Sequence, residues 1–282
     1  MKGSILLVSA LALAGPGAAA PVPAPSAPAF RPFAPTRFSV VVQGTGPDVI
    51  LIPGLTGSRD VWKGTVAAVP GYRYHLVQVA GFAGTPARGN AKGNVVAPLA
   101  EEVARYIHSR GLRRPAIVGH SMGGTVAMMV AARHPSLAGK VMVVDMLPQP
   151  AGIVGGDAAG MRGVADSLRD LSSTPGGRRL VESAIRLFGN PESEADPDVT
   201  ARATHELALT DLSPELPRIA APLTVVYASL DPSRRAADDR RYRTAYAGKP
   251  GVKLVRVDNS GHMIMYDQPA RFRSELKAFL AR

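Results

Sequence analysis

The residue in this chain that is best placed for chemistry is Ser121, because of what surrounds it. It lies in the run Gly-His-Ser-Met-Gly-Gly (119–124), after an apolar run at 115–118 and before an apolar helical stretch. Glycines two positions away on either side let a strand reverse sharply into a helix, where a Cβ would collide with backbone. A strained serine on such a turn costs on the order of 1–3 kcal/mol, and strain of this kind clusters at functional sites. We therefore expect Ser121 to be a nucleophile rather than an incidental serine in a glycine-rich turn.

A serine hydroxyl needs a base within hydrogen-bond reach, and the base needs a third group to orient it. His262 is the best candidate base. It ends the polar run Asn-Ser-Gly-His (259–262), which follows the last predicted strand and precedes the last predicted helix. The apolar run Met-Ile-Met at 263–265 then indicates an anchored loop. His120 is expected to shape the turn beside Ser121, and the remaining histidines are weaker candidates: His75, His108, His134 and His205.

Two aspartates could orient the histidine, and both follow predicted strands. Asp231 comes after the strand 223–228, and Asp145 ends the strand 141–144. Active sites of open α/β sheets gather at the carboxyl ends of strands, and the order serine, acid, histidine fits either residue. We favour Asp231 and keep Asp145 as the alternative. Asp258 is interpreted as a side chain that stabilises the turn before His262.

Negative charge that develops on an attacked carbonyl needs fixed hydrogen-bond donors. The backbone N–H of Met122 opens the helix after Ser121, where the helix dipole adds a favourable field. The second donor is expected from the loop Leu-Ile-Pro-Gly-Leu-Thr-Gly (51–57), with the N–H of Leu55 preferred and that of Thr56 as the alternative.

The element pattern indicates an α/β fold with a mostly parallel sheet flanked by helices. Helices are expected from a cap at Asn94 to Gly111, at 122–133 and at 270–280. Residues 149–217 break the alternation and predict a helical cap, so the core would comprise 37–148 and 218–282. The apolar runs that predict strands are 38–42, 49–52, 74–79, 116–118, 141–144, 223–228 and 252–257.

Composition narrows the possible classes of protein. The chain has 282 residues and no cysteine, which excludes disulfides, thiolate metal sites and a cysteine nucleophile. Its formal net charge of +11 comes from charges scattered along the chain, and aromatic residues make up 5%. The densest basic segment, 234–243, is interrupted by two aspartates and predicts a solvated helix face. We therefore expect no nucleic-acid partner, and docking on polyanions is a minor alternative.

The first 36 residues predict export. Lys2, the apolar run 5–14 and the small residues Ala18–Ala20 match a signal peptide over 1–20, with a Pro/Ala-rich tether at 21–36. A cytoplasmic N-terminus without structure is the alternative. The apolar run is too short for a stable membrane anchor, and the expected location is the periplasm or the exterior of the cell.

Together these residues resemble the α/β-hydrolase superfamily over about 37–282. The motifs that carry the resemblance lie at 51–54, 81–86, 119–124, 229–231 and 261–269. The resemblance implies a mainly eight-stranded sheet, a cap between strands six and seven, and no cofactor or metal. It does not fix the substrate.

We expect a serine hydrolase that cleaves a small carboxylic ester or lactone through an acyl-enzyme. The alternatives are a C–C or amide hydrolase of this fold, or a small-molecule binding protein with little turnover. The substrate pocket is expected to be apolar, and the residues expected to line it are Met146, Leu147, Met161 and Met263.

Overall fold

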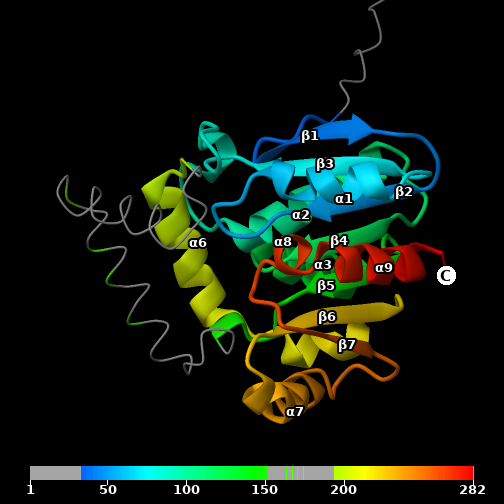
Figure 1. Cartoon of the computed structure of the whole chain (residues 1–282). Helices are drawn as coiled ribbons and strands as arrows, with labels where there is room; N and C mark the ends of the chain where they lie inside the picture. The colour runs from blue at the N-terminus through cyan, green and yellow to red at the C-terminus, as the bar shows by residue number, and fades with distance from the viewer. Residues whose placement is uncertain are drawn as a thin grey trace, which may run out of the picture. The chain divides into compact units, whose positions relative to one another are not determined.

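The computed structural model describes residues 33–151 and 194–281, together with residues 163, 167, 170 and 174. In these residues a seven-stranded sheet has the order β1-β3-β2-β4-β5-β6-β7 (Figure 1). Strand β1 is antiparallel to β3, and every other pairing is parallel. The strands are β1 (Phe38–Gln43), β2 (Asp48–Ile52), β3 (Arg73–Val79), β4 (Ala116–His120), β5 (Lys140–Val144), β6 (Leu223–Ser229) and β7 (Lys253–Asp258).

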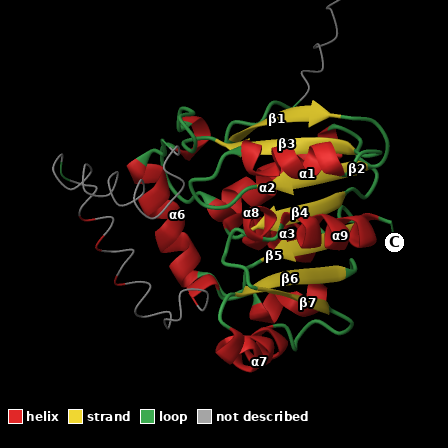
Figure 2. Ribbon diagram, viewed as in Figure 1, coloured by secondary structure: helices red, strands yellow, loops and turns green. Residues whose placement is uncertain are grey.

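Helices cover both faces of the sheet (Figure 2), and the strand residues alternate between two apolar clusters. In β2, Ile50 and Ile52 join one cluster while Val49 and Leu51 join the other, as the two-residue period of a strand requires. The first cluster receives side chains from α2, α3 and α7, and the second from α1 and α9. The helices are α1 (Lys63–Ala68), α2 (Val96–Ser109), α3 (Met122–Arg133), α6 (Pro197–Leu209), α7 (Arg235–Ala245), α8 (Ile264–Asp267) and α9 (Pro269–Leu280).

The sequence-based prediction of an α/β sheet flanked by helices is confirmed. Every apolar run expected to form a strand does so, and the helices expected behind Ser121 and at the C-terminus are α3 and α9. The described residues supply seven strands rather than the eight that the resemblance implied. The long insertion consequently lies between β5 and β6 of the described sheet.

The start of α2 differs from the prediction. Asn94 was expected to cap this helix, but the N-cap position is Val95, which makes no side-chain capping bond. Glu206 of α6 caps the helix from a distance: its carboxylate accepts hydrogen bonds from the backbone N–H groups of Val95, Val96 and Ala97 at 2.7–2.8 Å. An acidic group at a helix N-terminus is favourable, so this contact fastens α6 to the core.

The expected cap is described only in part. Its C-terminal portion forms α6 and the 3₁₀ turn Ser213–Arg218, whereas the amphipathic pieces expected near 161–171 and 179–188 lie almost entirely outside the described residues. Across the part of the chain that the structure describes, no helix combines the length and apolarity that a membrane crossing demands.

Candidate active site

The turn at Ser121 has the geometry that the glycine spacing predicts. Strand β4 ends at His120, α3 begins at Met122, and Ser121 between them has φ +53° and ψ −123°. This is a conformation that L-residues rarely adopt. The Ser121 N–H donates to the carbonyl of Val144 at 2.9 Å, which ties the turn to the end of β5.

Close backbone packing explains the two glycines that flank the turn. A Cβ on Gly119 would overlap the carbonyl of Gly123, and a Cβ on Gly123 would overlap the carbonyl oxygens of Ile52 and Pro53. Neither neighbour is a flexible side chain, so neither can move aside cheaply. The serine is thus presented by backbone segments that pack too closely for any side chain at these positions.

His262 is oriented by Asp145. The Nδ1 of His262 lies 2.7 Å from Oδ2 of Asp145, and because a carboxylate only accepts, Nδ1 donates. Asp145 follows β5, is buried at 7% exposure and has φ +50°. The His262 side chain is 41% exposed. The histidine therefore has one nitrogen fixed by a buried carboxylate while part of the ring stays accessible.

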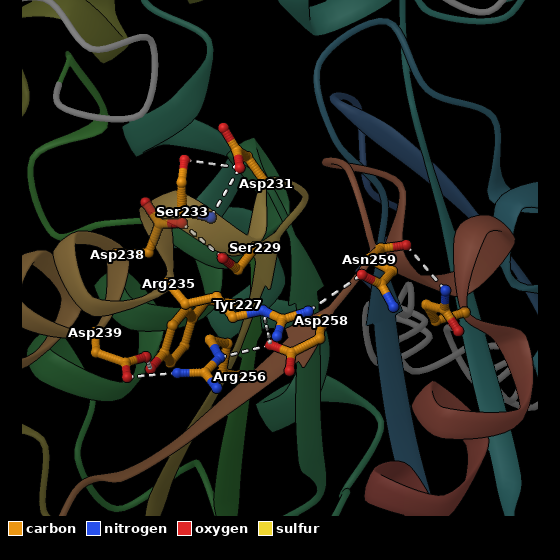
Figure 3. Close-up of polar contacts among 11 residues, drawn as sticks. Tyr227, Ser229, Asp231, Ser233, Arg235, Asp238, Asp239, Arg256, Asp258 and Asn259 are labelled. Atoms are coloured by element: carbon orange, nitrogen blue, oxygen red, sulfur yellow. Dashed lines mark hydrogen bonds and ion pairs between the residues drawn. The ribbon is translucent and has the colours of Figure 1, made fainter.

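The contact expected between Asp231 and His262 is not made. Asp231 is exposed, and its Oδ1 accepts from the backbone N–H and the hydroxyl of Ser233, both at 2.8 Å (Figure 3). These two bonds, the backbone one first, lower the pKa of Asp231 below its ordinary value. Asp231 is the N-cap of the turn Pro232–Arg234, and Asp followed by Pro is a helix-start signal that the sequence already contained. Asp145, the alternative, holds the expected position.

His120 fixes the loop that contains His262. Its Nε2 donates to the backbone carbonyl of His262 at 3.0 Å, and the two rings lie 4.7 Å apart. Burial, followed by the nearby His262, lowers the pKa of His120 to about 3. His120 is therefore neutral and serves as a donor. Gly54 packs against the same corner, where a Cβ would come within 3.0 Å of His120 and 3.1 Å of Ser121.

The two backbone donors expected for an oxyanion are unpaired among the described residues. In the turn 54–57 the Gly57 N–H donates to Gly54 O at 3.1 Å, and Thr56 has φ +58°. Within residues 33–151 and 194–281 the N–H groups of Leu55 and Met122 donate to no protein acceptor. Both groups are thus available to a ligand.

Of the four residues expected to line a pocket, the structure describes Met146, Leu147 and Met263. Met146 is buried in one apolar cluster, and Met263 packs against the other. Leu147 is buried at 4% exposure at one side of a groove of about 490 Å³, which α7 also lines with Arg240 and Arg241. Met161 lies outside the described residues.

A polar network connects β6, β7 and α7 with Asn259, at the start of the histidine loop (Figure 3). Arg256 bonds both Asp258, at 2.6 Å, and Asp239, whose Oδ1 also accepts from the Tyr227 hydroxyl at 2.6 Å. Asp258, expected to stabilise the turn before His262, forms ion pairs with Arg256 of its own strand and Arg235 of α7. Asn259, at φ +54°, accepts from Arg235 at 3.2 Å. The loop before His262 is therefore tied to β7 and α7.

Sequence reasoning did not anticipate one residue of this site. Tyr242, in the arginine-rich helix α7, donates its hydroxyl to Oδ1 of Asp145 at 2.9 Å. The helix is otherwise largely exposed, as expected, and Tyr242 is its one fully buried side chain. A lone tyrosine in a polar helix gives no sequence signal of such a contact.

Comparisons with known proteins agree with this architecture. Residues 49–275 match the model of the alpha/beta hydrolase family. A pimeloyl-[acyl-carrier protein] methyl ester esterase of Vibrio atlanticus is 26% identical, over 84% of this chain and 96% of the relative.

Solved structures show the same fold. An esterase from Thermogutta terrifontis has a TM-score of 0.69 at 20% identity, covering 86% of this chain and 93% of that one. The enol-lactonase from Burkholderia xenovorans LB400 has a TM-score of 0.64 at 20% identity, covering 87% and 96%. The chain belongs to the alpha/beta hydrolase family.

Proposed function

We propose that this protein is a serine hydrolase that cleaves a carboxylic ester or lactone through an acyl-enzyme, with Ser121, His262 and Asp145 as its triad. The observation that carries the proposal is the 2.7 Å bond between His262 Nδ1 and Asp145 Oδ2, beside a strained serine turn. This bond holds the proton on Nδ1 and leaves Nε2 as the free base. The esterase and lactonase names of similar proteins favour the same bond type.

In the proposed reaction, Ser121 Oγ attacks the carbonyl carbon while its proton passes to Nε2 of His262. Asp145 stabilises the imidazolium that forms, and the N–H groups of Met122 and Leu55 bind the oxyanion. Collapse of the tetrahedral intermediate expels the alcohol, which takes the proton from His262. Water then attacks the acyl-enzyme by the same route and releases the acid.

We expect the hydrogen bond between Ser121 and His262 to form when substrate binds. Among the described residues the Ser121 hydroxyl makes no hydrogen bond. Catalytic hydrogen bonds are often long in the absence of substrate and tighten in the complex.

The test is a series of p-nitrophenyl esters of graded chain length, with lactones, amides and carbamates alongside, on the wild type and Ser121→Ala. Loss of the serine is expected to lower ester turnover by several orders of magnitude. A fluorophosphonate should label Ser121 stoichiometrically, and His262→Ala should abolish the labelling. Equal turnover by wild type and Ser121→Ala would overturn the proposal, and absence of labelling would favour a binding protein with little turnover.

We also propose export through residues 1–20, on the strength of their composition alone. N-terminal sequencing of protein recovered from the periplasm or medium should show a chain that lacks these residues. Recovery of the full-length chain from the cytoplasm would refute the proposal.

A further inference from the structure

Asp145 receives more hydrogen bonds than the orientation of a histidine requires. Oδ2 faces His262, while Oδ1 accepts from both the backbone N–H of Ala228 and the hydroxyl of Tyr242, each at 2.9 Å. The backbone donor comes from β6 and the side-chain donor from α7. Three donors, from β6, α7 and the loop after β7, therefore fix one carboxylate in the interior.

Tyr242 is held rigidly for this contact. Its ring is 3% exposed and stacks on Tyr227, with centroids 4.1 Å apart and an interplanar angle of 17°. The ring of Tyr246 lies nearly parallel to that of Tyr242, with centroids 6.5 Å apart and an interplanar angle of 7°. Burial, reinforced by the neighbouring Asp145, raises the pKa of Tyr242 well above its ordinary value. The phenol therefore keeps its proton and can only donate to the carboxylate.

We propose that Tyr242 is a positioning residue of the catalytic triad, whose hydroxyl orients the Asp145 carboxylate and draws its negative charge toward Oδ1. This inference rests on the proposed serine hydrolase function. A carboxylate with one oxygen occupied by two donors presents the other squarely to His262. Oδ2, which faces His262, also carries less negative charge than it would without the two donors to Oδ1. It therefore attracts the imidazolium less strongly, and the imidazolium gives up its proton more readily.

The other titratable and charged groups around Tyr242, Asp145 and His262 come from β4, β6, α7 and the residue after α7. His120, at the end of β4, lies beside the His262 ring, and Tyr227 of β6 stacks on Tyr242. Arg241 of α7 and Tyr246, the residue that follows α7, are the other near groups. Neutral His120 and protonated tyrosines carry no charge at neutral pH, so Tyr242→Phe changes the local field chiefly through Asp145.

The experiment compares Tyr242→Phe with Tyr246→Phe on p-nitrophenyl acetate across pH. Tyr246 is the matched control: it is buried, follows the last residue of α7 and donates to the carbonyl of Met146 at 2.7 Å, without a bond to Asp145. Tyr242→Phe should lower kcat about 10-fold, the size expected for a lost charge-assisted hydrogen bond. KM should change less than about twofold. The midpoint of the acidic limb of the rate profile should rise by roughly half a unit. Tyr246→Phe should leave both kcat and the midpoint near wild-type values.

A double variant tests whether Tyr242 acts through Asp145. In an Asp145→Asn background, Tyr242→Phe should not lower kcat further, because the carboxylate that the tyrosine positions is already gone. If Tyr242→Phe does not fold, 3-fluorotyrosine at position 242 keeps the ring and strengthens the donor, and should move the acidic midpoint downward. Equal kcat and midpoint for the two phenylalanine variants, an additive double variant, or no shift with fluorotyrosine would overturn the inference. Full activity of Ser121→Ala, or absence of fluorophosphonate labelling in the wild type, would instead overturn the proposed function.

Discussion

Replacement of Asp145 by asparagine should cost far more activity than the same replacement at Asp231. The hydrogen bonds around Asp145 dictate how an amide would sit there. Ala228 N–H and Tyr242 O–H both point at Oδ1 and need an acceptor, so the amide carbonyl must take that place. The NH₂ group is then left facing Nδ1 of His262, where a donor now meets the ring.

The histidine must respond by becoming an acceptor at Nδ1, which moves its proton to Nε2. A protonated Nε2 cannot take the proton of Ser121, and the imidazolium also loses its counter-charge. We expect kcat to fall by about 10³–10⁴-fold, which is the size of the loss that the wrong tautomer causes in a serine triad. Thermal melting should show that the variant stays folded, because its shape and two of its hydrogen bonds are kept.

Asp231→Asn is the matched control. Its carbonyl oxygen can still accept from the N–H and hydroxyl of Ser233, and the residue is exposed. Activity should stay within about twofold of wild type, as for surface substitutions away from special features. Steady-state rates on p-nitrophenyl acetate decide the matter. A larger loss in Asp231→Asn than in Asp145→Asn would refute the reasoning and return Asp231 to the triad.

Three further outcomes are expected elsewhere in the fold. Gly119→Ala should prevent recovery of folded, fluorophosphonate-reactive protein, because its Cβ would overlap the backbone of Gly123. The control Gly64→Ala in α1, whose Cβ would meet only Arg273 at 3.5 Å, should fold and label normally. Normal labelling of both variants would contradict the packing argument. Glu206→Ala should lower the free energy of unfolding in urea by about 1–2 kcal/mol, because three N–H groups at the start of α2 lose their acceptor. Glu215→Ala, which breaks a surface pair with Arg133, should lower the free energy of unfolding by less than about 1 kcal/mol. The pKa of His120 is lowered to about 3 while an unfolded histidine binds a proton near 6.5, so the unfolded state takes up the extra proton as pH falls. Relative to His120→Gln, the wild type should therefore lose about 1.4 kcal/mol of stability per pH unit between pH 6 and pH 4, and parallel stability curves would show that His120 is not buried in its neutral form.

Local sequence determined much of this protein. A serine between closely spaced glycines specifies the strained turn, because the backbone segments that meet there exclude side chains. At Gly119 the excluding segment is local, at Gly123, whereas at Gly123 it is Ile52 and Pro53 after β2. Apolar runs predicted the strands of the described sheet, most directly β2, β4 and β5, which are buried on both faces and therefore apolar almost throughout. His262 was identifiable because its loop follows the last strand directly.

Tertiary structure decided the partners that lie far apart in the chain. Asp145 and Asp231 both follow strands of one parallel sheet, and the sequence does not say which carboxylate turns toward a histidine 117 or 31 residues away. Asp145 makes that contact: its backbone has φ +50°, and donors from β6 and α7 hold its buried carboxylate. Asp231 instead caps its own 3₁₀ turn. Glu206 capping α2 and Tyr242 contacting Asp145 follow the same rule: a hydrogen bond between distant elements depends on how those elements pack, and no local pattern encodes it.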